Sequence, residues 1–286
     1  MARQIEVNVK GGLGNQIFGL AAGWAVAAEL NSNLLINGRD LGWRGSNRSR
    51  KLELNQLKWQ SFPNELNFIG TRRTPSFGRV GNRITTYVMQ SALNARSIFD
   101  TNDNPENFIE IANSAKEGKI LDGNYINFKW LDLAHTYGFP TKFNLLAADI
   151  PYVPQKEEVA VHIRLGDFLH YPNLFPIPSL AYYEHALVIL KAKRYAIYSD
   201  DISVAKDLYP KLLENAHKIV SPSQYTSTET FVMLNSYSSI VTSSSTFSSI
   251  AAWGIGKQGG KVVCPEFMLF DDKEESRPSN WIKVSN

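Results

Sequence analysis

The first forty residues show two hydrophobic patterns in turn. Residues 4–10 alternate polar and β-branched side chains and end at two glycines, which predicts a strand followed by a turn. Residues 16–30 are rich in alanine, leucine and tryptophan and contain no proline, so they favour a helix, and residues 33–36 resemble a second strand. A strand, a helix and a strand in this order predict neighbouring parallel strands.

The middle of the chain has a weaker pattern. Residues 38–51 are basic, rich in glycine and serine and without a period, which is typical of an exposed loop. A helix is predicted over 106–116 and a strand over 119–121, and the prolines of 151–157 favour a domain boundary. We therefore expect two domains, residues 1–154 and residues 155–286.

The second half has the clearest alternation. It predicts strands over residues 159–164, 195–198, 218–220, 239–242 and 261–263, and helices over residues 180–191, 202–213, 228–237 and 246–253. This is the pattern of a doubly wound α/β fold, in which ligands bind at the C-terminal ends of the strands. The expected architecture is two α/β halves that face a cleft.

Composition narrows the class of protein. A hydrophobic fraction of 43% over 286 residues is enough for globular cores, and a net charge of +3 lacks the concentrated charge of nucleic-acid-binding proteins. The lone cysteine, Cys264, can form no intrachain disulfide and no cysteine zinc cluster, which indicates a reducing compartment. The N-terminus lacks the apolar core of a signal peptide, and residues 17–28 are too short to span a bilayer. We expect a soluble cytoplasmic protein.

Four motifs follow predicted strands. The first, KGGLGNQIF at 10–18, lets backbone approach a ligand closely and leads into a helix with unpaired N–H groups. It is not the GxGxxG fingerprint, and a plain strand-to-helix turn is an equal interpretation.

In the second motif, VHIRLGDF at 161–168, His162 and Arg164 leave the strand on the same side, because side chains alternate. Arginine presents a fork of donors that suits a diphosphate, and Asp167 is near enough in sequence to hold that fork. A purely structural Arg–Asp pair and a buried core histidine are the competing interpretations.

The third motif, YSDD at 198–201, ends in two carboxylates that could bind a metal, accept from a nucleotide or cap a helix. Capping is expected for one of Asp200 and Asp201, which leaves the other for a nucleotide. The fourth, TSSSTFSSIAAW at 242–253, places hydroxyls at a helix N-terminus, which suits an anion, although capping explains part of it. Thr226 and Glu229 have capping-box spacing, so Glu229 is interpreted as structural.

Several catalytic motifs are missing from the sequence. It contains no GxxxxGK[ST] loop, HExxH motif or GxSxG elbow. The remaining histidines have no metal-ligand spacing to one another; they are His135, His170, His185 and His217. Kinase, zinc-hydrolase and serine-esterase activities are therefore not supported.

Taken in order, GGLGNQIF, HIRLGDF, YSDD and SSSTFSSIAAW resemble the motif set of the family 11 α-1,2-fucosyltransferases. The stretch ILDGNYINFKWL at 120–131 is similar to that family's LDGYxQxxxYF segment, so the resemblance extends over most of the chain. It implies a GT-B-like fold, a GDP-fucose donor, an acceptor with a terminal galactose, inversion at the anomeric carbon and no metal. Physical reasoning also indicates that no metal is needed, since Arg164 and a helix N-terminus can stabilise the departing diphosphate.

The resemblance also assigns roles to residues. Arg164 is expected to hold the β-phosphate and Asp167 to position it, and these two are the candidate catalytic residues. His162 and one of Asp200 or Asp201 are expected to contact the guanosine. The diphosphate would be lined by Ser244, Ser245, Thr246 and Phe247, and the fucose and acceptor would be approached by Gly12, Gly14, Asn15 and Gln16. The resemblance identifies no general base.

Two departures indicate a divergent member. Leu165 stands where the family's HxRRxD pattern has a second arginine, a form that resembles the protein O-fucosyltransferases. Ser249 and Ile250 stand where the family often has two tryptophans. The alternatives are a glycosyltransferase with another donor or linkage and an inactive sugar-nucleotide or glycan-binding module. Surface-polysaccharide synthesis is the expected setting, and the basic loop 39–51 is either solvated or in peripheral contact with anionic lipids of the inner membrane.

Overall fold

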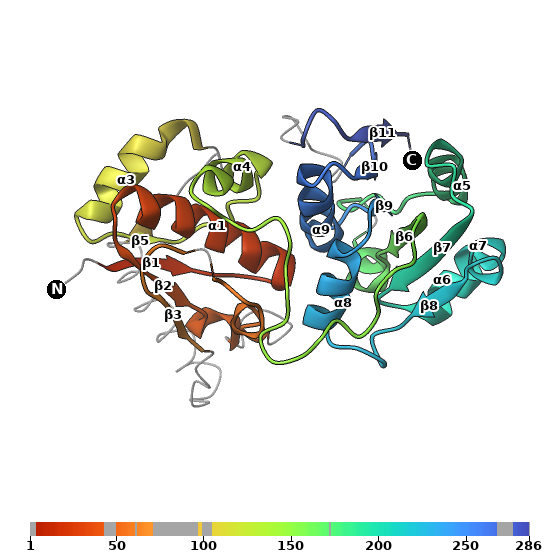
Figure 1. Ribbon diagram of the computed structural model, residues 1–286, viewed down its shortest axis with the longest axis horizontal. Helices are drawn as coiled ribbons and strands as arrows, with labels where there is room; N and C mark the ends of the chain where they lie inside the picture. Colours follow the sequence, from red (N-terminus) through yellow and green to blue (C-terminus); the bar gives the residue numbers. More distant parts are fainter. Residues whose placement is uncertain are drawn as a thin grey trace. The chain divides into compact units, whose positions relative to one another are not determined.

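The chain folds into two compact α/β units, each built on a parallel sheet (Figure 1). One unit comprises Met1–Asn55 and Trp59–Pro140, and the other comprises Gln56–Lys58 and Thr141–Asn286. The computed structural model describes residues 4–42, 50–60, 62–70, 97–98, 105–171, 173–267 and 277–285. The predicted basic loop lies mostly outside these residues. Within them, no helix is long and apolar enough to cross a membrane.

The N-terminal unit contains a five-stranded sheet of order β3-β2-β1-β5-β4, with parallel pairing throughout. Its strands are β1 (Gln4–Asn8), β2 (Asn33–Asn37), β3 (Leu66–Ile69), β4 (Ser97–Ile98) and β5 (Ile120–Leu121). Its helices are α1 (Leu13–Glu29), α3 (Phe108–Lys116) and α4 (Phe128–Thr136), with 3₁₀ turns at Arg39–Gly42, Leu54–Gln56 and Pro105–Asn107. The three helices lie on one face of the sheet (Figure 1).

Helix α1 is buried almost all round, because it packs on the sheet on one side and against α3 and α4 on others. A Cβ atom on Gly23 would lie only 2.8 Å from Val7 Cγ1, so a larger side chain would push the helix off β1. On another side of the helix, the Trp24 ring packs edge-on against Phe62 and Phe139, with centroids 4.7 and 5.2 Å apart. This dense core fixes the end of β1 and the glycine turn that follows it.

The C-terminal unit contains a six-stranded parallel sheet of order β11-β10-β9-β6-β7-β8. Its strands are β6 (Glu158–Ile163), β7 (Arg194–Ser199), β8 (Lys218–Val220), β9 (Ser239–Val241), β10 (Lys261–Pro265) and β11 (Ile282–Val284). Its helices are α5 (Leu180–Ile189), α6 (Ile202–Leu208), α7 (Pro210–Glu214), α8 (Ser227–Asn235) and α9 (Thr246–Lys257), with a 3₁₀ turn at Gly166–His170. Chain order reverses between β6 and β9, which makes this the topological switch point.

Helices cover both faces of the C-terminal sheet, α5 to α7 on one and α8 and α9 on the other (Figure 1). Strand β6 is buried along its whole length, as expected of a central parallel strand. Val161, Ile163 and Leu165 alternate into the core beneath α5. His162 and Arg164 therefore point to the opposite side, as predicted.

The predicted strands and helices of the second half are confirmed, apart from their ends. The largest shift is at α9, which ends at Lys257 instead of residue 253. One prediction is wrong, because the helix expected over 202–213 is two helices that break at Tyr209. Pro210 has no amide hydrogen to continue the first helix, and it is well suited to the first turn of the second. The short elements β3, β4, β11 and α4 were not predicted.

The boundary between the units lies after Pro140, not at the predicted residue 154. The Asn235 side chain at the end of α8 holds the intervening segment: its Oδ1 accepts from Phe143 N at 2.9 Å and its Nδ2 donates to Thr141 O at 3.1 Å. Residues 141–154 therefore belong to the C-terminal unit, and the prolines at 151 and 154 lie in a loop within it.

Candidate functional site

Three of the predicted motifs meet at the switch point of the C-terminal sheet. Strands β6, β7 and β9 run parallel, so the segments that follow them emerge at one edge. Ile163 pairs with Ser199 across β6 and β7, which places the next residues, Arg164 and Asp200, side by side. HIRLGDF, YSDD and TSSSTF are thus neighbours although 29 residues separate the first two along the chain and 40 separate the last two.

The guanidinium of Arg164 is held between two carboxylates. Its Nη1 lies 2.9 Å from Asp200 Oδ2, and its Nη2 makes a short hydrogen bond to Asp167 Oδ1, so the predicted Arg164–Asp167 pair forms. The guanidinium carbon lies 5.4 Å from the centre of the Phe168 ring, within cation–π range. The side chain is 24% exposed, and its buried Nε has no hydrogen-bond partner among the described residues. The guanidinium is therefore held by contacts on several sides but is still accessible to solvent.

The backbone after Arg164 is fixed by the same aspartate. Asp200 Oδ1 accepts from Leu165 N at 2.8 Å, while the Leu165 side chain is fully buried in the core. A Cβ atom on Gly166 would lie well inside van der Waals contact of Asp200 Oδ2. Glycine is therefore required at 166 for the carboxylate to sit where it does.

The two aspartates of YSDD have different partners. Asp201 is the N-cap of α6, and its Oδ1 accepts from Val204 N at 3.1 Å, so capping by one of the pair is confirmed. In the other, Asp200, one oxygen pairs with Arg164 and the second accepts from Leu165 N, and its expected contact with a nucleotide stays a prediction.

His162 is a buried, neutral imidazole. Its side chain is 5% exposed, its Nδ1 lies 2.8 Å from Ser243 Oγ, and its ring centroid is 5.7 Å from that of Phe247. Burial, and next the positive charge of Arg164, lower the pKa of His162 to about 3. One ring nitrogen is therefore a donor and the other an acceptor. Sequence reasoning missed Ser243; the available signal was its place directly beside the predicted Ser244.

The N-terminus of α9 follows β9 at the same edge. Ser245 is the N-cap residue, but its side chain makes no capping hydrogen bond, unlike Thr226, which forms a full capping box with Glu229 on α8. Ser244 Oγ instead donates to Phe267 O at 3.1 Å. Capping by Ser245 therefore does not explain the motif. The helix dipole and first-turn amides favour an anion at this end.

The chemistry available at the switch point suits an anion. It combines one guanidinium with a helix N-terminus, and the half-buried Thr246 and Phe247 begin that helix. In the part of the chain that the structure describes, no group of three or more His, Cys, Asp or Glu side chains is arranged to hold a metal ion. Metal independence stays a prediction.

In the N-terminal unit, the glycine turn follows β1, the central strand of that sheet. Gly11 has a φ of +68°, a left-handed conformation that favours glycine. Gly12 precedes α1 with open space around it, since the nearest atom to an added Cβ would be 4.0 Å away. Gly14 is buried in the first turn of α1 and Asn15 is half-buried.

Gln16 holds this turn to the segment that follows β2. Its Nε2 donates to Gly11 O at 3.1 Å and Lys51 O at 2.9 Å, and its Oε1 accepts from Glu53 N at 3.0 Å. The side chain is fully buried. All three partners are backbone groups, so Gln16 supports the loop instead of presenting its amide at the surface.

Comparison with known proteins identifies the family. Residues 143–285 match the model of Glycosyl transferase family 11, a range that begins near the start of the C-terminal unit and contains the whole switch-point site. The chain belongs to glycosyl transferase family 11. The fucosyltransferase family expected from the sequence motifs is thereby confirmed for this glycosyltransferase. No curated protein matches the family 11 chain in sequence.

Solved structures share the fold of this family 11 protein at low identity. FUT1 of Arabidopsis thaliana, an arginine-to-lysine mutant in complex with GDP, is 15% identical, with a TM-score of 0.52 over 99% of this chain and 75% of that chain. POFUT1 in complex with GDP is 13% identical, with a TM-score of 0.52 over 92% and 98%. NodZ fucosyltransferase from Bradyrhizobium is 12% identical, with a TM-score of 0.45 over 88% and 93%. The similarity to FUT1 and POFUT1 confirms the GT-B-like α/β fold.

Proposed function

We propose that this family 11 glycosyltransferase moves L-fucose from GDP-fucose to a hydroxyl of a terminal galactoside, with inversion and in α-1,2 linkage. The observation that carries the proposal is the guanidinium of Arg164, held at the switch point beside the N-terminus of α9. Structures of FUT1 and POFUT1, which share the fold, are complexes with GDP, and this supports a guanosine diphosphate donor.

In this proposal, the site acts mainly on the leaving group. Cleavage of the fucose–phosphate bond adds negative charge to the departing GDP while the sugar takes on oxocarbenium character. Arg164 binds the β-phosphate through charge-assisted hydrogen bonds, and the N-terminus of α9 adds backbone donors and a favourable dipole. These groups stabilise charge as it develops, so the proposed reaction requires no metal.

The remaining predicted residues surround the donor. Neutral His162, whose ring lies near Phe247, contacts the guanosine, and the diphosphate is lined by Ser244, Ser245, Thr246 and Phe247. The proposed contacts of Gly12, Gly14, Asn15 and Gln16 with the fucose and acceptor rest on the sequence motif alone. A place in surface-polysaccharide synthesis, on the cytoplasmic side of the membrane, completes the proposal and rests on the sequence alone.

A transfer assay tests the proposal. The protein is incubated with GDP-fucose, a panel of β-galactosides and EDTA, and products are analysed by mass spectrometry and the linkage by NMR. We expect an α-1,2-fucosylated galactoside with EDTA present. Transfer from a different nucleotide sugar, or to a different position, would establish the first alternative. Tight GDP binding by calorimetry without turnover on any acceptor would establish an inactive binding module.

A further inference from the structure

The Asp200 carboxylate contacts two parts of the segment that follows β6. One carboxylate oxygen accepts from Leu165 N at 2.8 Å, and the other pairs with Arg164 Nη1 at 2.9 Å. The neighbouring strand β7 therefore fixes both the backbone and the guanidinium that follow β6. We infer that Asp200 is a positioning residue for Arg164, not a contact of the nucleoside. This inference rests on the proposed role of Arg164 in donor binding.

The site has a physical need for such a residue. A free arginine side chain has about 2 kcal/mol of rotamer entropy to lose when it is ordered. Leu165 fills the core at the position where the family pattern has a second arginine, so orientation of the leaving group depends on one guanidinium. Asp167, Asp200 and the Phe168 ring restrict that guanidinium before the donor arrives. Preorganisation of this kind lowers the barrier to reaction.

The charge of Asp200 allows a positioning role to be distinguished from a contact with the nucleoside. Two carboxylates around one guanidinium give the cluster a net charge of −1, so Asp200 opposes an incoming diphosphate electrostatically. Removal of its charge should therefore leave GDP binding unchanged or tighter while the rate falls. A carboxylate that accepted hydrogen bonds from the guanosine would have the opposite signature, because its loss would weaken GDP binding.

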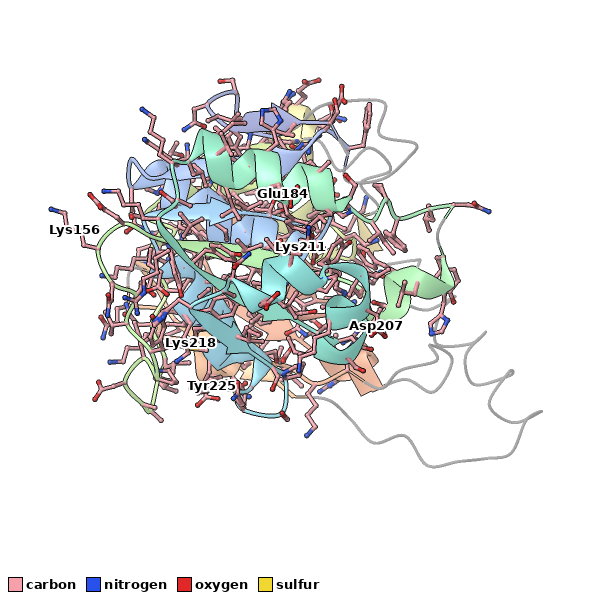
Figure 2. All side chains as sticks on the ribbon, turned by 90° about the vertical axis from the view of Figure 1, so that its right-hand side faces the viewer. Lys156, Glu184, Asp207, Lys211, Lys218 and Tyr225 are labelled. Atoms are coloured by element: carbon pink, nitrogen blue, oxygen red, sulfur yellow. The ribbon has the colours of Figure 1, made fainter. Side chains whose placement is uncertain are left out.

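The first test is Asp200→Asn, with Asp207→Asn as the matched control. Asp207 is an exposed residue of α6, and Figure 2 shows it on the surface of the C-terminal unit. We expect Asp200→Asn to lower kcat about 10- to 100-fold, the scale of a small misplacement of a catalytic group. Its Kd for GDP, measured by calorimetry, should stay within about threefold of the parent value or fall. GDP binding weakened tenfold or more, or an unchanged kcat, overturns the inference.

The second test uses Gly166, which touches the same carboxylate. Gly166→Ala displaces Asp200, because the new methyl group would overlap Oδ2. We expect it to reproduce the loss of kcat in the parent but to add no further loss in an Asp200→Ala background, where the overlap is gone. Gly70→Ala is the control, since a Cβ there meets nothing within 4 Å. Additive losses in the double variant overturn the inference.

The behaviour of the parent protein distinguishes failure of the proposed function from failure of the inference about Asp200. A parent that neither binds GDP nor transfers fucose overturns the proposed function, and the inference falls with it. An active parent whose Asp200 and Gly166 variants behave like the controls overturns the inference alone.

Discussion

His162 Nδ1 lies 2.8 Å from Ser243 Oγ, and this hydrogen bond joins the end of β6 to the segment that follows β9 across the switch point. The imidazole is buried, and its pKa is lowered to about 3 by that burial and by Arg164. The folded protein therefore keeps a neutral histidine where an unfolded chain would have a pKa near 6.5.

This difference predicts a specific loss of stability in acid. Below about pH 6.5 the unfolded chain takes up a proton at His162 that the folded chain takes up only near pH 3, so protons favour unfolding between these values. The contribution is about 1.4 kcal/mol per pH unit. Urea unfolding at pH 7, 6 and 5 should show a shallower loss for His162→Asn than for the parent. The exposed His185→Asn should follow the parent; equal slopes for all three would contradict the prediction.

Arg164→Ala should remove catalysis without unfolding the protein. In the proposed mechanism Arg164 stabilises the leaving phosphate, so its loss should lower kcat about 100- to 1,000-fold. Because the side chain is 24% exposed and lies at a strand end, the Tm should change little. Arg164→Lys keeps the charge but cannot reach both carboxylates, so GDP binding should recover more than the rate does.

The matched control is Lys211→Ala, an exposed cation on α7 that Figure 2 labels. It should keep the parent rate and the parent affinity for GDP. Wild-type turnover in Arg164→Ala would show that the arginine is structural.

Gln16→Leu should destabilise the N-terminal unit. The substitution leaves the carbonyls of Gly11 and Lys51 and the amide of Glu53 without their buried partner. We expect the free energy of unfolding to fall by about 2–4 kcal/mol, measured in urea. The exposed Gln60→Leu should stay within about 0.5 kcal/mol of the parent. Similar values for both variants would remove the supporting role of Gln16.

Asn235→Ala should loosen the segment that begins the C-terminal unit. Its amide bonds to Thr141 and Phe143, and also donates to Ala251 O at 3.2 Å in α9. We expect a loss of about 2–4 kcal/mol in unfolding free energy and faster proteolysis within 141–154. The exposed Asn215→Ala is the control, and proteolysis equal to that of the control would place the boundary elsewhere.

Local sequence signals predicted much of the C-terminal unit. The buried central strands appear as short apolar runs, and the Arg164–Asp167 pair forms between residues three apart on one turn. The second partner of Arg164, Asp200, could not be predicted from local sequence, because the register of β6 against β7 brings the two residues together. The two-residue β4 and the partly exposed β11 carry too little pattern to predict, since their pairing depends on neighbouring strands.

The predicted domain boundary was wrong for a related reason. The prolines at 151 and 154 are a local signal of a loop, whereas membership of a unit depends on long-range hydrogen bonds such as those of Asn235. Side-chain contacts between residues distant in sequence cannot be derived from composition.

Leu165 sets a limit on how this enzyme can be altered. Its side chain belongs to the packed interior under α5, so an arginine introduced there would bury an unpaired charge at a cost of several kcal/mol. A direct reversion to the arginine pair is therefore closed to this chain as a single substitution. Under the proposed mechanism, a second cation for the leaving group would come from a different segment. Directed evolution of a faster variant should therefore randomise residues outside position 165.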